Sequence, residues 1–236
     1  MSDLAVSVEH VYKSFGNEYV LQDVSLGMEK GKIYGLVGRN GSGKTVLMKC
    51  ILGFMKPEKG RVHVFGQEVG KLCDFAPDTG MMIENPGFLP GESGLRNLMW
   101  LAKLGKKADA RRVEEMIRLV GLKSAQKKKV GQYSMGMRQR LGIAQALLED
   151  PALLVLDEPM NGLDHQGVQE MRRLFRDLRD SGKTILLASH FAQDIEELCD
   201  EVWHMEKGKV PDRSWYPYSS LPEVYSLQGS RSKEMP

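Results

Sequence analysis

The fold of this chain is decided by Gly38-Arg39-Asn40-Gly41-Ser42-Gly43-Lys44-Thr45, which fits the pattern G-x-x-x-x-G-K-[ST] at every fixed position. The apolar run 33–37 before it predicts a buried strand, and residues 46–52 after it predict a helix. Glycines let the backbone wrap closely around a phosphate, so that several N–H groups point inward. The following helix adds the positive end of its dipole. The stretch therefore predicts a phosphate loop that binds a nucleotide.

Two side chains of this loop have chemical roles of their own. Lys44 supplies a compact cation for the outer phosphates, and the Thr45 hydroxyl is suited to bind Mg²⁺. The alternative is a chance glycine-rich turn, which arises in roughly 1% of chains of this length. Because the strand and the helix that the mechanism needs both flank the loop, we expect a nucleotide site here.

The composition excludes several classes of protein. The 236 residues carry 33 basic and 31 acidic side chains, a balance that gives no sign of a nucleic-acid partner. The 3 cysteines are widely spaced, as is typical of a reducing cytosol and not of a metal cluster. No signal peptide is evident, and no apolar run reaches the about 18 residues that a membrane span requires. We therefore expect a cytosolic protein that reaches a membrane only through a partner.

Strand and helix patterns on either side of a helical block define the fold class. Residues 4–8 and 24–28 alternate in polarity and predict half-buried antiparallel strands, and 60–65 predicts another short strand. From about 91 to 148 the apolar spacing is helical, and the last helix begins after Ser134 as its N-cap. We interpret about 88–148 as a helical subdomain inserted into an α/β core.

Alternation of strand and helix resumes after that block. The runs 152–156 and 184–188 flank a helical stretch, and this order predicts a parallel sheet with the site at the carboxyl ends of its strands. Residues 1–210 are thus expected to form one α/β domain of phosphate-loop type with a small antiparallel β subdomain. Residues 211–236, rich in proline and aromatic residues, are expected to form a poorly ordered tail.

Three further residues follow predicted strands and have the chemistry of phosphoryl transfer to water. Asp157 ends an apolar strand, where a carboxylate can hold Mg²⁺, and Glu158 follows it, where a carboxylate can polarise the attacking water. His190 could hydrogen-bond the γ-phosphate; a lone histidine is more often structural, but the company of the other motifs favours the phosphate role. Phe15, in a predicted turn, either stacks on an adenine base or packs within the turn.

The segment 133–140, Tyr-Ser-Met-Gly-Met-Arg-Gln-Arg, indicates a second anion-binding helix terminus. Ser134 caps this helix, and the nearby Gly136, which has no side chain, leaves the backbone at the start of the helix accessible. One ATP needs only one phosphate loop. Two such termini on one chain suggest that a second copy of the chain completes each nucleotide pocket.

Taken together, these motifs resemble the ATP-binding cassette ATPases, the nucleotide-binding subunits of ABC transporters. The resemblance covers about residues 4–208. Its motifs are Walker A at 38–45, the signature at 133–137, Walker B with the catalytic glutamate at 153–158, the D-loop at 161–164 and the switch histidine His190. Phe15 falls where this family stacks an aromatic residue on adenine.

Two features depart from the usual family pattern. Glu84 stands where the family usually has glutamine, and its surroundings, together with 133–144, resemble the bacitracin and lantibiotic branch. A carboxylate there could bind Mg²⁺, or it could simply face solvent. The tail after 210 does not match the family, and nothing is implied for it.

The resemblance implies an ATPase subunit on the inner face of the cell membrane. ATP and Mg²⁺ would bind between Walker A of one chain and the signature of a second cassette, and the dimer would drive a separate integral-membrane permease. Residues 88–148, with the Glu84 loop, would face that permease, and the cargo would be a peptide antibiotic. The alternatives are a related ATPase that acts on ribosomes or DNA, and a catalytically silent regulatory subunit. Lys44, Asp157, Glu158 and His190 argue against the silent subunit.

Overall fold

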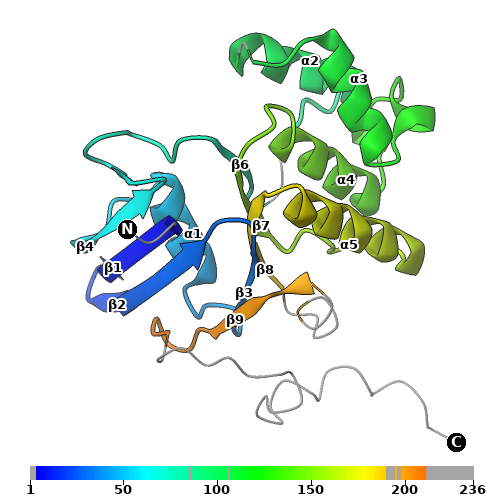
Figure 1. Ribbon diagram of the computed structural model, residues 1–236. Helices are drawn as coiled ribbons and strands as arrows, with labels where there is room; N and C mark the ends of the chain where they lie inside the picture. Colours follow the sequence, from blue (N-terminus) through cyan, green and yellow to red (C-terminus); the bar gives the residue numbers. More distant parts are fainter. Residues whose placement is uncertain (1–3, 85–86, 106, 190–194, 196–197, 211–236) are drawn as a thin grey trace, which may run out of the picture.

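Two β-sheets with one helix between them form the part of the molecule that carries the phosphate loop (Figure 1). The computed structural model describes residues 4–84, 87–105, 107–189, 195 and 198–210. The antiparallel sheet has the order β2-β1-β4-β5, from β1 (Leu4–Phe15), β2 (Glu18–Glu29), β4 (Lys59–Val64) and β5 (Gln67–Glu68). The parallel sheet has the order β6-β7-β8-β3-β9, from β3 (Ile33–Val37), β6 (Thr79–Met82), β7 (Leu153–Asp157), β8 (Thr184–Ala188) and β9 (Glu201–His204).

The parallel sheet gathers the predicted catalytic segments on one edge. Strands β3 and β8 are buried at every residue, as expected for short apolar strands covered on both faces. Ala188 pairs with Asp157 of β7, and it also pairs with Leu36 of β3, so the three strands end at the same level. The phosphate loop after β3 and the carboxylates at the end of β7 therefore lie at one edge, which confirms the predicted fold class.

Helix α1 (Lys44–Leu52) lies between the two sheets. It begins directly after Gly43, whose φ of 108° lies in the left-handed region. Its buried residues Leu47, Met48 and Ile51 share one apolar cluster with side chains of both sheets. Burial on both sides fixes α1, and with it the phosphate loop, relative to the parallel sheet.

The predicted helical block is present and joins the core through a second apolar cluster. It contains α2 (Gly94–Gly105), α3 (Ala110–Leu119), the short 3₁₀ turns η1 (Lys123–Ala125) and η2 (Val130–Gln132), and α4 (Met135–Ala146). Ser134 caps α4 as predicted, since its hydroxyl accepts a hydrogen bond from the Met137 N–H at 3.2 Å. Helix α5 (His165–Asp180) lies beside α4, and Glu170 of α5 forms an ion pair with Arg140 of α4 at 2.8 Å (Figure 1). None of the described helices is long and apolar enough to cross a membrane.

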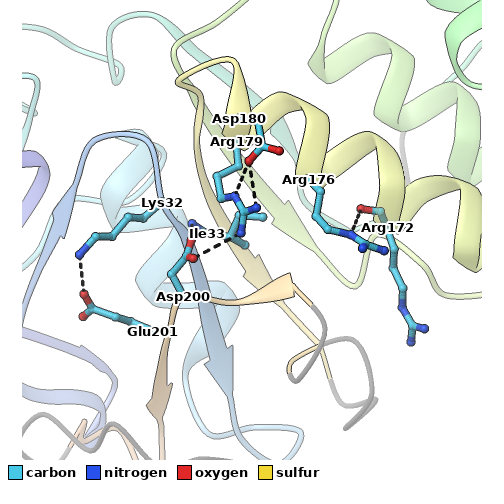
Figure 2. Close-up of polar contacts among 8 residues, drawn as sticks. All are labelled: Lys32, Ile33, Arg172, Arg176, Arg179, Asp180, Asp200 and Glu201. Atoms are coloured by element: carbon cyan, nitrogen blue, oxygen red, sulfur yellow. Dashed lines mark hydrogen bonds and ion pairs between the residues drawn. The ribbon is translucent and has the colours of Figure 1, made fainter.

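Strand β9 was not predicted from the sequence, and tertiary contacts explain it. Its four residues pair in parallel with β3, and the Trp203 ring stacks on Tyr34 with 4.8 Å between ring centroids. Asp200, just before β9, accepts a hydrogen bond of 2.7 Å from the Ile33 N–H and pairs with Arg179 at 3.4 Å (Figure 2). These bonds lie at the end of the sheet opposite the phosphate loop. They stabilise an edge strand that is too short to show the apolar periodicity of a strand in its sequence.

Candidate nucleotide-binding site

A pocket of about 490 Å³ lies at the carboxyl edge of the parallel sheet. Residues predicted from the sequence make up most of its wall, namely Asn40, Gly41, Ser42, Gly43, Lys44, Thr45, Glu84, Asp157 and Glu158. The other lining residues, which were not predicted as site residues, are Val20, Val46, Met135, Gln139 and Asn161, the last of them in the D-loop motif 161–164. Met135, Gln139 and Asn161 lie within or next to recognised motifs, so proximity in sequence was the only signal that could have indicated them.

Two glycines of the phosphate loop lie where a side chain would collide with a neighbouring backbone. A Cβ at Gly38 would collide with the Met205 carbonyl oxygen, and one at Gly43 would lie 2.7 Å from the Val20 carbonyl oxygen. Ser42 is buried, and its hydroxyl has no hydrogen-bond partner among the described residues. A buried hydroxyl without a partner costs free energy unless a ligand or water satisfies it. The loop thus has the form and the unsatisfied polar group of an anion site.

Lys44 is the cation inside this loop. Its ammonium donates hydrogen bonds to the Gly38 carbonyl at 2.6 Å and the Arg39 carbonyl at 3.2 Å, and the residue is only 7% exposed. Burial lowers the pKa of Lys44, and the nearby carboxylates of Glu158 and Asp157 act in the opposite direction. An anionic phosphate in the pocket would stabilise the charged form of this lysine further.

Thr45 and Asp157 place two oxygen ligands at the pocket wall. The Thr45 hydroxyl donates a 2.8 Å hydrogen bond to the Asp157 carboxylate across 112 positions of sequence. Among the described residues, no group of three or more His, Cys, Asp or Glu side chains could hold a metal ion. Mg²⁺ commonly binds through one or two protein oxygens and completes its shell with phosphates and water. The donor set therefore fits Mg²⁺ that arrives together with a nucleotide.

Glu158 follows Asp157 and has an unusual backbone. Its φ is 49°, in the left-handed region that residues other than glycine seldom adopt. Its N–H donates to the Ala188 carbonyl at 2.9 Å, and its own carbonyl accepts from the Asn161 N–H at 3.1 Å. The Gln139 side-chain amide donates to that same carbonyl at 2.6 Å. The Glu158 backbone is therefore held in a specific conformation at the pocket.

The N-terminus of α4 forms a second, more open surface. Met135, half exposed, reaches the pocket and lies against Gly162, where a Cβ would come within 2.6 Å of the Met135 side chain. A Cβ at Gly136 would lie 2.8 Å from the Gly162 carbonyl oxygen. Neither Ser134 nor Gly136 lines the pocket of its own chain. The helix end that was predicted as a second anion site thus lies next to the pocket but outside it.

Three predicted residues differ in how the structure places them. Glu84, at φ 58°, lines the pocket, but its carboxylate forms an ion pair of 2.6 Å with Lys49 of α1, which the sequence did not indicate. Phe15 is half exposed at the end of β1 and is not among the lining residues. His190 lies outside the described residues.

Comparison with known proteins agrees with this arrangement. The sequence profile of the family described as ABC transporter matches residues 21–161. The chain is 39% identical over 210 residues to the bacitracin transport ATP-binding protein BcrA of Enterococcus faecalis, covering 88% of this chain and 68% of that protein. It is 33% identical over 224 residues to the lantibiotic transport ATP-binding protein SrtF of Streptococcus pyogenes, covering 94% and 96% of the two chains.

Solved structures show the same fold. An ATP-binding subunit of an ABC transporter matches with a TM-score of 0.82 at 24% identity, covering 96% of this chain and 95% of that one. A dimeric ATP-binding cassette in a post-hydrolysis state with ADP and Pi matches with a TM-score of 0.79 at 22% identity, covering 89% and 97%. The alternative of an ATPase acting on ribosomes or DNA is not supported by these relatives. The chain belongs to the ABC transporter family, in which it is an ATPase subunit.

Proposed function

We propose that this ATPase subunit pairs with a second copy of itself or a related cassette to enclose two ATP molecules, and that the pair drives a permease for a peptide antibiotic. The observation that carries the proposal is the pocket that brings the phosphate loop together with Asp157 and Glu158. Each ATP would lie between that pocket and the Ser134 and Gly136 end of α4 from the other chain. The position of this helix end outside its own chain's pocket supports such sharing.

Each residue that the sequence predicted for the site has a proposed role in ATP hydrolysis. Lys44 and the N–H groups of residues 38–45 bind the phosphates, and Phe15 contacts the adenine ring. Thr45 and Asp157 would hold Mg²⁺, with Glu84 as a further ligand, and the ion would neutralise phosphate charge when bound. Glu158 polarises a water whose oxygen attacks the γ-phosphorus, while the bond between the γ-phosphorus and the bridging oxygen breaks. His190 contacts the γ-phosphate.

Several features support the proposed permease and its cargo. The names of the relatives BcrA and SrtF refer to bacitracin and lantibiotic transport, and both of these are peptide antibiotics. A second cavity of about 240 Å³, lined in part by Phe54, Met81 and Glu84, adjoins the nucleotide pocket and exposes apolar side chains. We assign this cavity and the helical block to the permease contact, which would hold the subunit at the inner face of the membrane.

The test is the variant Glu158→Gln. An amide cannot polarise water as a carboxylate does, so hydrolysis should fall about 100-fold or more while ATP binding persists. ATP should then trap a dimer that light scattering coupled to size-exclusion chromatography detects. The double variant Lys44→Ala/Glu158→Gln, which should not bind ATP, is the control and should remain monomeric. A Glu158→Gln chain that binds ATP and stays monomeric at high protein concentration would contradict the shared site.

A further inference from the structure

Gln139 is a buried amide on α4, one turn beyond the helix end that was assigned to the second nucleotide. It is 9% exposed, and its Nε2 donates the 2.6 Å hydrogen bond to the Glu158 carbonyl. Burying an amide costs free energy unless the amide is hydrogen-bonded. The bond to the Glu158 carbonyl provides a partner for the Gln139 amide. The bond connects two elements that are separated by 19 positions in sequence and that belong to different parts of the fold.

The Glu158 backbone is strained and depends on its hydrogen bonds. A left-handed φ at a residue other than glycine costs roughly 1 kcal/mol or more and persists only where the surroundings enforce it. Hydrogen bonds to this backbone connect it with three different segments. The Glu158 N–H donates to the Ala188 carbonyl at the end of β8, and the Glu158 carbonyl accepts from the Asn161 N–H in the turn that follows β7. The side-chain amide of Gln139 donates to the same carbonyl from the helical block.

We propose that Gln139 is a positioning residue for ATP hydrolysis, which holds the Glu158 backbone so that its carboxylate meets the attacking water. The inference rests on the proposed role of Glu158. Because the φ and ψ of a residue set the direction of its side chain, a loss of this bond would let the carboxylate turn away from the γ-phosphate. The same helix begins at Ser134, so α4 links the surface that faces the second nucleotide to the catalytic carboxylate of its own chain.

The first experiment is Gln139→Met, which keeps the length of the side chain and removes the donor. We expect kcat for ATP hydrolysis to fall about tenfold, with KM and ATP affinity within about twofold of the original chain. Gln22→Met is the matched control, because the Gln22 amide also donates to a backbone carbonyl, that of Lys207 at 3.1 Å, away from Glu158. This control should keep the original kcat. Gln139→His restores a ring N–H donor at a similar reach and should recover most of the activity.

A double-variant cycle separates positioning from a merely structural role. If Gln139 acts through the Glu158 carboxylate, Gln139→Met should lower the residual single-turnover rate of Glu158→Gln less than about twofold. A full tenfold loss in both backgrounds, or equal activity of the Met and His variants, would overturn the inference. Should the methionine variant fail to fold, judged by ATP affinity, Gln139→Leu would replace it. Undiminished hydrolysis by Glu158→Gln alone would instead refute the proposed function, whatever Gln139→Met does.

Discussion

The two helix ends that face nucleotide in the proposed dimer differ in how they are completed. At α1, the helix cap is Gly43, which makes no side-chain hydrogen bond, and the buried ammonium of Lys44 lies inside the loop. At α4, the Ser134 hydroxyl already caps the helix, and the guanidinium of Arg138 at this end donates to the Tyr133 carbonyl at 2.7 Å. The end of α1 is thus enclosed in a pocket, whereas the end of α4 is capped and open.

This difference indicates how much of the site one chain supplies. An anion held by α1 gains a buried cation, loop N–H groups and the helix dipole, all within one chain. An anion at α4 meets a hydroxyl, N–H groups and the dipole on an open surface, and the nearby Arg138 guanidinium already donates to a backbone carbonyl, so this end alone should bind more weakly. We infer that α1 determines nucleotide affinity and α4 determines dimer affinity. Three substitutions test these separate roles of α1 and α4, from the largest expected effect to the smallest.

The largest effect should come from Lys44→Ala. The phosphates lose the buried cation of the loop, so ATP affinity should fall about 100-fold or more, beyond detection in ordinary calorimetry. Lys103→Ala removes an exposed lysine of α2 and is the control, which should bind ATP normally. Unchanged ATP affinity of Lys44→Ala at low-millimolar Mg²⁺ would refute the assignment of the loop.

An intermediate effect is expected from Ser134→Ala. The variant loses the N-cap hydrogen bond, worth about 1 kcal/mol, and a hydroxyl that would face the partner's nucleotide. In the Glu158→Gln background, the ATP-bound dimer should dissociate about tenfold more readily, as sedimentation velocity would show. The ATP affinity of the monomer should stay the same. A drop in monomer affinity instead would place Ser134 in its own chain's pocket and remove the contrast between the helix ends.

The smallest effect should come from Glu84→Gln. This substitution tests the contribution of one side chain at the edge of the nucleotide pocket beside α1. The ion pair with Lys49 is partly exposed, so its loss should change stability by about 1 kcal/mol or less. A neutral amide binds Mg²⁺ less well than a carboxylate, so the Mg²⁺ concentration for half-maximal ATPase activity should rise severalfold. Stimulation by the permease should weaken as well.

The matched control for Glu84→Gln is Glu9→Gln. Glu9 also forms a partly exposed ion pair, with Arg61 at 3.4 Å, but it lies in the antiparallel sheet. Its Mg²⁺ titration should match that of the original chain, with and without the permease. If the Glu84→Gln curves match the original chain too, Glu84 has no metal role and only pairs with Lys49.

The sequence alone predicted the features that depend on short-range order. The strand, loop and helix around 38–45, the N-cap Ser134, and the apolar runs before Asp157 and Ser189 all follow from local periodicity and capping. Parallel strands place their carboxyl ends together, so the meeting of the phosphate loop with Asp157 was also predictable. These predictions held because each depends on backbone geometry within a few residues or on a general rule of sheet topology.

Only the tertiary structure decided which distant side chains pair. It showed that Lys49 binds Glu84, that Gln139 holds the Glu158 carbonyl, and that β9 forms on the edge of β3. No local pattern marks these choices, because a lysine or a glutamine on a helix has many possible partners until packing brings one within about 3 Å. The left-handed backbone at Glu158 follows the same rule. A strained conformation persists only where contacts from several elements outweigh its cost, and those contacts exist only in the folded chain.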